Sequence, residues 1–104
     1  MAAKNKLRGT AEENRIVNYA EKFGMDAIRS WGSDGRSRGL DESVDVTIST
    51  DFKDYHVQVK KRKKIAKYLH IPEGCDVVTI SEDYKKPVVV VPIEMFLDLI
   101  RRPI

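Results

Sequence analysis

The alternation of apolar and polar residues between Ser43 and Lys64 places the strongest constraint on how this chain can fold. Valine and isoleucine alternate with polar residues in two short runs, Val44–Ile48 and Val57–Lys60, on either side of a polar segment. Because successive side chains of a strand point to opposite faces, this period of two predicts a β-hairpin with one apolar and one polar face. The polar face carries Asp45, Gln58 and Lys60.

The length of the hairpin turn decides which of these polar side chains are neighbours. A two-residue loop at Asp51-Phe52 sets Asp45 opposite Gln58. A four-residue loop from Asp51 to Asp54 sets Asp45 opposite Lys60 instead. The sequence does not decide between the two registers. In both of them the Asp45 carboxylate, the Gln58 amide and the Lys60 ammonium lie within the reach of cross-strand pairs. Such a patch suits a divalent metal and a water molecule beside a phosphate, and a simple ion pair on a polar sheet face is the alternative.

Positive charge is concentrated in a few places along the chain. The net charge is only +3 over 104 residues, but the residues from Lys60 to Lys64 are all cations. Arg29, Arg36 and Arg38 form a second cluster. Local basic patches attract polyanions whatever the total charge, so nucleic acid is a candidate partner, with a solvated charged face as the alternative.

Cysteine usage and hydropathy indicate the compartment. Cys75 is the only cysteine, which excludes an intrachain disulfide and fits a reducing environment. One cysteine and two histidines make a cysteine-histidine zinc cage an unlikely interpretation. The longest apolar run, Val88–Ile93, is too short to span a bilayer. We therefore expect a soluble, cytoplasmic protein with no membrane partner.

Helix-capping residues, glycines and prolines mark the boundaries of the other helices and strands on either side of the predicted hairpin. We expect residues 1–9 to form a flexible basic arm and residues 10–104 to form one domain. Thr10 and Glu13 fit a capping box that starts a helix, and Gly24 ends this helix. The remaining expected elements are a strand at Met25–Trp31, a loop at Gly32–Glu42, a short helix at Lys64–Ile71, strands at Cys75–Ser81 and Pro87–Val91, and a helix at Ile93–Ile100. This order predicts an α/β fold with a central mixed five-stranded sheet flanked by helices.

The C-terminal part is richer in apolar residues than one half-exposed strand and one amphipathic helix require. The four consecutive residues Val88–Val91 are valines, which predicts a strand that is buried on both faces. The helix at Ile93–Ile100 carries apolar residues on more than one face. Because a chain of this size buries only a small core, these residues predict a homodimer interface, with the core itself as the alternative place for them.

A series of residues in the first part of the chain follows the spacing of one nuclease family. The series consists of Gly9, Glu13, Gly24, the run Arg29–Ser33 (RSWGS), Val44-Asp45 and Gln58-Val59-Lys60. In these residues the chain resembles the archaeal-type Holliday junction resolvases, which belong to the PD-(D/E)xK nuclease superfamily and have a restriction-endonuclease-like fold. The resemblance covers residues 8–60 closely and the rest of the chain only in the order of its elements.

The resemblance implies an endonuclease that depends on Mg²⁺, with Mn²⁺ as an alternative metal. Asp45 and Glu13 would bind the metal through carboxylate oxygens, and the Gln58 side chain and the Val59 backbone carbonyl would add two more oxygen ligands. Lys60 would position or activate the attacking water. The sequence departs from the family at Gln58, where an acid is usual, so the site has one negative charge fewer. A protein that binds branched DNA without cutting it is therefore the alternative, as is another DNA nuclease of the same fold.

The resemblance also implies the DNA substrate and its contacts. Ser33 would contact the scissile phosphate. The residues that would bind DNA are Arg8, Arg29, Ser33, Arg36, Arg38, Lys61, Arg62, Lys63 and Lys64. Contacts with the DNA backbone carry no sequence code, which fits an enzyme of DNA recombination and repair that recognises a branched shape. A two-fold symmetric homodimer would present two identical active sites to a four-way junction and make paired symmetric nicks.

Overall fold

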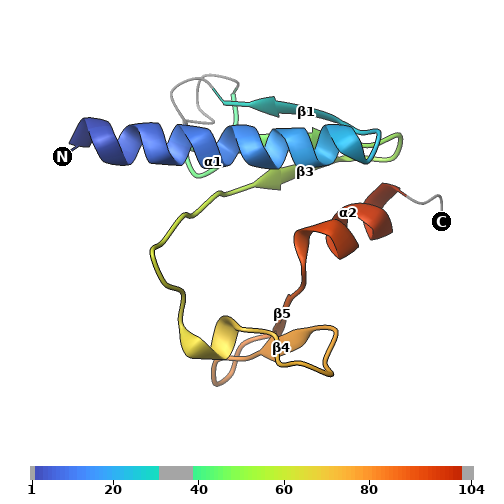
Figure 1. Ribbon diagram of the computed structural model, residues 1–104. Helices are drawn as coiled ribbons and strands as arrows, with labels where there is room; N and C mark the ends of the chain where they lie inside the picture. Colours follow the sequence, from blue (N-terminus) through green and yellow to red (C-terminus); the bar gives the residue numbers. More distant parts are fainter. Residues whose placement is uncertain (1, 31–38, 102–104) are drawn as a thin grey trace.

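A helix and a three-stranded antiparallel sheet form the larger part of the molecule (Figure 1). The computed structural model describes residues 2–30 and 39–101, with side chains from Gly9 onward. The elements are α1 (Ala2–Lys22), β1 (Asp26–Arg29), β2 (Val46–Ser49), β3 (Asp54–Val57), the 3₁₀ turn η3 (Lys67–Leu69), β4 (Val78–Ile80), β5 (Val88–Val90) and α2 (Ile93–Arg101). The fold is α/β, as predicted. We call α1, β1, β2, β3 and α2 together the body.

The register of β2 and β3 is that of the two-residue loop. Val46 pairs with Val57, and the pairing continues in step toward the turn. The Thr50 amide donates to the Lys53 carbonyl oxygen at 3.0 Å, so residues 51–52 form the tip. The predicted hairpin is confirmed with the first of its two registers, but its second strand, β3, ends at Val57, so Asp45, Gln58 and Lys60 lie just outside the paired strands.

The Thr50 hydroxyl holds this turn together. Its Oγ1 accepts from the amides of Phe52 and Lys53, each at 3.1 Å, and lies 3.0 Å from the Lys53 carbonyl oxygen. We expect Thr50→Ala to lower the free energy of unfolding by about 1 kcal/mol, the net value of such hydrogen bonds. Thr50→Ser keeps the oxygen and is the control, expected to lose less than half as much. Urea unfolding measures both variants, and equal losses would show that the hydroxyl does not stabilise the turn.

The core lies between the three-stranded sheet and the two helices. Its fully or nearly buried residues are Ala20, Met25, Val46, Ile48 and Leu97. The predicted C-terminal helix is confirmed as α2, and both helices supply residues to this core. Phe96 of α2 meets Tyr55 of β3 edge to face, with ring centroids 5.9 Å apart. The core is therefore completed by α2, the C-terminal helix, which is distant in sequence from the other core elements.

The first helix begins earlier than the sequence analysis predicts. It starts at Ala2, so the segment expected as an arm is helical and Thr10 is an interior residue with no capping role. Alanine, lysine, leucine and arginine at positions 2–8 all favour helix, and extending an existing helix costs far less than nucleating one. The Thr10 hydroxyl instead lies 3.5 Å from Nη1 of Arg29.

The second predicted helix is replaced in the structure by a single 3₁₀ turn. Instead of a helix at Lys64–Ile71, the chain forms only the 3₁₀ turn η3. Lysines at 63, 64 and 67 would repel one another at helical spacing, and Pro72 bars extension toward the C-terminus.

All five expected strands form, but they make two antiparallel sheets and not one mixed sheet. After β3 the chain continues without helix or strand from residue 58 to residue 66 and leaves the body (Figure 1). The strands β4 and β5 therefore pair with each other, as a short turn between neighbouring strands allows. Val88 is 63% exposed and Val89 55%, so the expected burial of this strand on both faces is wrong within one chain. Across residues 2–30 and 39–101, no helix is long and apolar enough to cross a membrane.

Candidate active site

The two predicted carboxylates belong to one end of the three-stranded sheet, where β1 ends and β2 begins. Glu13 on α1 is only 4% exposed, and its Oε1 lies 3.2 Å from Nη1 of Arg29, the last residue of β1. The next residue, Ser30, donates its amide to the Asp45 carbonyl oxygen at 2.8 Å. Glu13 and Asp45 are thus connected through the two consecutive residues Arg29 and Ser30.

Asp45 lies where the pairing of β2 with β3 ends, and both its backbone and its side chain bond to the chain that follows β3. It is 9% exposed, and its amide donates to the Val57 carbonyl oxygen at 2.9 Å. Its Oδ2 accepts from the Val59 amide at 2.7 Å, a short charge-assisted bond that fixes the carboxylate. Oδ1 makes no hydrogen bond to a described residue and keeps some contact with solvent. The structure therefore brings Asp45 and the Val59 backbone together and leaves one carboxylate oxygen available.

Glu13 is held as a buried member of an ion pair. A carboxylate removed from water needs a partner, and Arg29, itself only 28% exposed, supplies a positive charge. The expected cap role of Glu13 is wrong because the helix starts at Ala2, and the side chain instead lies buried on the inner side of α1. Arg29, expected to contact DNA, is instead engaged with this carboxylate.

Glu12, which the sequence does not single out, joins α1 to the basic segment after β3. Its Oε2 lies 3.2 Å from Nζ of Lys61, and its Oε1 lies 3.3 Å from Nη1 of Arg15. The Tyr19 side chain and the Glu12 carboxylate raise the pKa of Arg15, which stays cationic. In the sequence, the feature that indicates Glu12 is its position next to Glu13 on a helix, together with the basic segment elsewhere in the chain. Glu12 ties the segment after β3 to α1, and Lys61 is paired as a result.

Two other predicted residues, Gln58 and Lys60, lie on the exposed side of the same segment. Within the described residues, neither side chain forms a hydrogen bond or ion pair with Asp45, whose Oδ2 accepts from the Val59 amide. The site is therefore only partly assembled, with the Asp45 carboxylate and the Val59 backbone in place beside the Glu13–Arg29 pair.

The donor set suits a hard divalent cation more than a transition metal. No three histidine, cysteine, aspartate or glutamate side chains converge on a metal position within the described residues. Mg²⁺ needs fewer, because it is commonly held by one or two carboxylates and keeps several waters. The Asp45 and Glu13 carboxylates are donors of that kind, whereas the predicted donor Gln58 lies on the exposed side of its segment. Glu13 must exchange part of its contact with Arg29 to take part.

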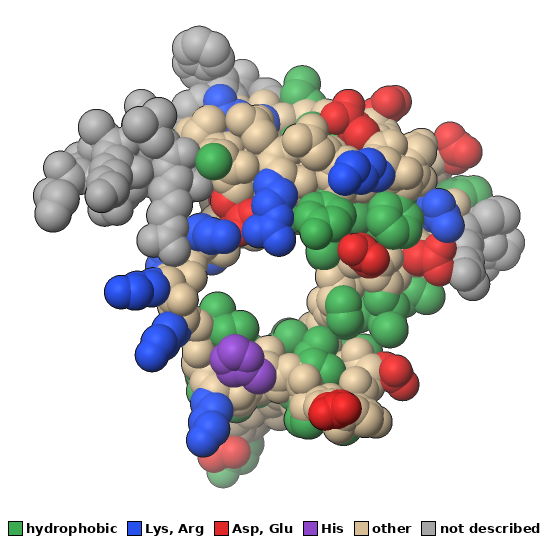
Figure 2. All heavy atoms as spheres, in the orientation of Figure 1, with side chains coloured by type: hydrophobic (Ala, Val, Ile, Leu, Met, Phe, Trp, Pro, Cys, Tyr) green, Lys and Arg blue, Asp and Glu red, His purple; other side chains and the backbone are tan. Residues whose placement is uncertain are grey.

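The basic segment after β3 lines a broad surface groove. Arg62, Lys63 and Lys64 are exposed, and blue side chains follow this side of the molecule in Figure 2. The residues that line the groove, of about 610 Å³, are Arg62, Lys63, Lys64, Ile65, Lys67 and His70. Lys67 and His70 were not predicted, and their proximity follows from the 3₁₀ turn. The predicted residues Ser33, Arg36 and Arg38, and the side chain of Arg8, lie outside the described residues.

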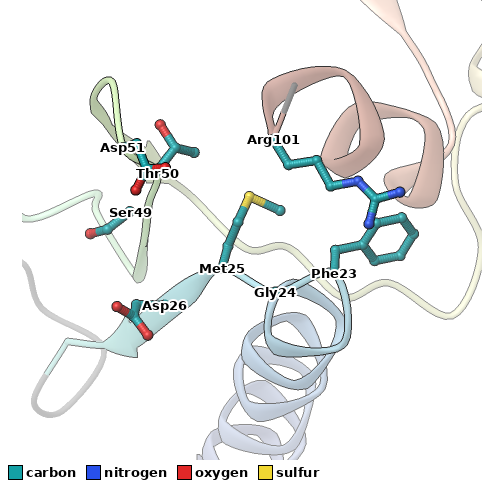
Figure 3. Close-up of a pocket in the computed structure, with 8 residues that line it drawn as sticks. All are labelled: Phe23, Gly24, Met25, Asp26, Ser49, Thr50, Asp51 and Arg101. Atoms are coloured by element: carbon teal, nitrogen blue, oxygen red, sulfur yellow. The ribbon is translucent and has the colours of Figure 1, made fainter. Parts of the chain in front are cut away.

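A separate pocket lies at the opposite end of the three-stranded sheet (Figure 3). It has a volume of about 270 Å³ and is lined by Phe23, Gly24, Met25, Asp26, Ser49, Thr50, Asp51 and Arg101. The Arg101 guanidinium lies 5.0 Å from the centre of the Phe23 ring and 2.8 Å from Oδ1 of Asp98. These contacts close the end of the core, and none of the predicted site residues lines this pocket.

No protein-family model, curated protein or solved structure matches the chain. The site is therefore interpreted from its own residues.

Proposed function

We propose that this chain is a metal-dependent DNA endonuclease that resolves four-way junctions in the cytoplasm by paired symmetric nicks. The observations that support the proposal are the buried Glu13–Arg29 pair at the end of β1 and the Asp45 carboxylate held by the Val59 amide at the start of β2, next to a basic segment. The order helix, three strands, then further strands and a helix is consistent with a variant of the restriction-endonuclease-like fold. In that fold β4 and β5 would extend the first sheet.

The proposed metal ligands are oxygen atoms of four residues. Asp45 would use Oδ1, since Oδ2 is occupied by the Val59 amide. The other ligands would be Glu13, the Gln58 side-chain oxygen and the Val59 carbonyl. A bound Mg²⁺ would neutralise phosphate charge and lower the pKa of a bound water. Mn²⁺ has the same ligand preference and is the natural substitute in assays.

The chain's own residues then supply positioning and charge. The Val59 amide keeps the Asp45 carboxylate in one orientation, which is the preorganisation that a phosphate site needs. Lys60 follows directly on Val59 and, as an exposed ammonium, would hold the attacking water or offset charge on the phosphate. Ser33 would contact the scissile phosphate.

The basic groove would hold the DNA backbone next to this site. Its cations come from consecutive residues and a short turn, and no aromatic ladder for unstacked bases accompanies them in the described residues. Phosphate contacts of this kind position DNA without reading its sequence, which suits selection by branched shape. Branched DNA is therefore the proposed partner.

A second candidate function is binding of branched DNA without cleavage. Two observations favour it: Glu13 is already paired with Arg29, and the neutral Gln58 is exposed and makes no contact with Asp45. A site with fewer negative charges binds a divalent cation less tightly. The Gln58→Glu variant restores the charge and is expected to create or strengthen cleavage if this candidate is correct.

The deciding experiment incubates an immobile four-way junction with the protein in Mg²⁺, in Mn²⁺ and in EDTA. Linear duplex and flap DNA that contain the same sequences serve as control substrates. Symmetric nicks on the junction alone, abolished by EDTA, support the resolving nuclease. Cleavage of linear or flap DNA at the same rate indicates another nuclease of the fold, and tight junction binding without nicks indicates the binding-only protein.

The salt dependence of binding tests the basic groove. We expect the double variant Lys63→Gln and Lys64→Gln to reduce the slope of log K against log salt concentration by about 1 to 2, because up to two phosphate contacts are lost. Affinity should fall equally for junctions of different sequence. Lys22→Gln, at the exposed end of α1, is the control and should leave the slope unchanged. Fluorescence anisotropy between 50 and 200 mM salt, roughly the range over which such contacts are resolved, gives the slopes. An unchanged slope in the double variant would remove this groove from the interface.

A further inference from the structure

The turn between β4 and β5 carries an unusual residue at its tip. The Lys85 amide donates to the Glu82 carbonyl oxygen at 3.0 Å, which closes a β-turn with Asp83 and Tyr84 at its centre. The φ angle of Tyr84 is +66°, and no other non-glycine residue in the described part of the chain has a positive φ. Glycine or asparagine is the usual residue at such a position, because a bulky side chain is strained in this conformation. The chain therefore has a large aromatic residue where glycine would form the turn more easily.

The Tyr84 side chain is also fully exposed. Its ring makes no hydrogen bond, ring contact or cation–π contact with another of the residues that the structure describes. The packing of the chain therefore gives no reason for a strained aromatic residue at this position. Strained residues persist mainly where they bind something, so these two observations point to a ligand for the ring.

The surroundings of the turn limit what this ligand can be. The 3₁₀ turn η3 and the β4–β5 hairpin lie together, on the other side of the molecule from α1 (Figure 1). The basic groove is lined by the segment that leads into η3, so the turn belongs to the same part of the molecule as this groove. A second groove, of about 460 Å³, begins at the turn and is lined by Ile80, Ser81, Glu82, Lys85, Lys86 and Val88. A polyanion bound along the basic groove is the ligand that this part of the molecule suits.

The charges at the turn itself balance. Nζ of Lys85 lies 2.7 Å from Oε2 of Glu82, and Asp83 and Lys86 carry the other two opposite charges. The turn therefore adds no net attraction for phosphate, and its distinctive group is the aromatic face of Tyr84. Aromatic faces stack on nucleobases with little dependence on the base sequence. Taking a base out of the stack costs least where stacking is already interrupted, as it is at a branch point.

We propose that Tyr84 stacks on a base at the branch point of DNA and thereby favours branched over linear DNA. The inference rests on the proposed function and adds to it the residue that contacts the branch. The basic groove contacts phosphates, which linear duplex offers as well, so a contact with bases at the branch strengthens the preference. Loss of one stacked base lowers affinity by about 5- to 150-fold, the equivalent of about 1 to 3 kcal/mol.

The first test compares the affinity of the full chain for an immobile four-way junction and for linear duplex, by fluorescence anisotropy in EDTA. We expect Tyr84→Leu, which removes the ring and keeps an apolar side chain, to bind the junction about tenfold more weakly and linear duplex within about twofold of wild type. Tyr84→Phe keeps the ring and should bind as wild type. Phe52→Leu, at the exposed tip of the β2–β3 hairpin, is the matched control and should change neither affinity. Equal junction affinity of Tyr84→Leu and wild type would overturn the proposal and would point to a protein as the partner of the ring.

The variant Tyr84→Gly separates binding from a structural role of the residue. Glycine adopts a positive φ without strain, so the midpoint of thermal unfolding should stay the same or rise, while junction affinity falls as in Tyr84→Leu. A lower midpoint together with weaker binding of both DNA forms would show that Tyr84 maintains the fold, and would overturn the proposal.

A crosslinking experiment locates the ring on the DNA and separates this proposal from the nuclease activity. 5-Iododeoxyuridine is placed either beside the branch point or in the middle of one arm, and irradiation links it to a neighbouring aromatic side chain. Crosslinking to the peptide that contains Tyr84 is expected only from the branch position. No crosslink to this peptide would overturn the proposal even if the junction is cut, whereas crosslinking without cleavage in Mg²⁺ or Mn²⁺ would overturn only the nuclease. A wild-type chain that binds junction and linear duplex equally well, or neither, would overturn both the proposal and branched DNA as the partner.

Discussion

Replacing Asp45 with asparagine is expected to lower junction cleavage by about 100-fold or more while the protein stays folded. The Asp45 carboxylate is the proposed anionic ligand with a free oxygen, and its loss removes several kcal/mol of metal-dependent stabilisation of the transition state. Asparagine still offers a carbonyl oxygen to the Val59 amide, so the end of the β2–β3 pairing is retained. Junction binding in EDTA should therefore be unchanged within about two-fold, which is less than 0.5 kcal/mol.

The control for this prediction is Asp54→Asn. Asp54 is an exposed aspartate at the other end of the same hairpin, on β3, and carries the same charge. We expect it to cleave at the wild-type rate. If Asp45→Asn also cleaves at that rate, the proposed site is wrong, whatever the activity of the wild-type protein.

Replacing Leu97 with alanine is expected to lower the free energy of unfolding by about 2 to 5 kcal/mol. Leu97 is completely buried in the core and comes from α2, so a cavity would open between this helix and the sheet. Domains of this size are stable by only about 5 to 15 kcal/mol, so the loss takes a large share of the total. Urea unfolding followed by circular dichroism measures it.

The same helix offers a matched control in Leu99→Ala. The substitution is chemically identical, but Leu99 is 60% exposed and leaves no enclosed cavity. We expect a loss below about 1 kcal/mol, as for other surface changes. Similar losses at the two positions would mean that α2 is not docked on the core as described.

The fold could be predicted from the sequence where a pattern is local. The alternation predicted the β2–β3 hairpin, and the predicted helix at Ile93–Ile100 agrees with α2 to within one residue. The start of α1 could not be found, because Thr10 has the chemistry of a cap but the preceding residues favour helix as well. The grouping of the strands into sheets depends on the path of residues 58–66, and no local pattern in that basic segment fixes it.

The two carboxylates of the candidate site could be predicted from the sequence. Asp45 and Glu13 were selected, and both lie at the same end of the sheet. The partners of these residues were not predicted, because the Arg29 ion pair and the Val59 amide depend on how α1 crosses the sheet. Glu12 was missed for the same reason, since only the packed structure brings Lys61 within 3.2 Å of it.

The return of α2 to the body also sets the order in which this chain can fold during synthesis. The last large residue of the core, Leu97, follows the end of β3 by a long excursion, so at about 5 to 20 residues per second the ribosome needs about 2 to 8 seconds to bridge the interval. During that time Val46 and Ile48 lack the contact with Leu97 of α2 that completes the core. Contacts between segments so distant along the chain slow folding, because loop closure must precede them. A nascent chain arrested after β3 should therefore be a target for chaperones, and release from that state should coincide with the appearance of α2.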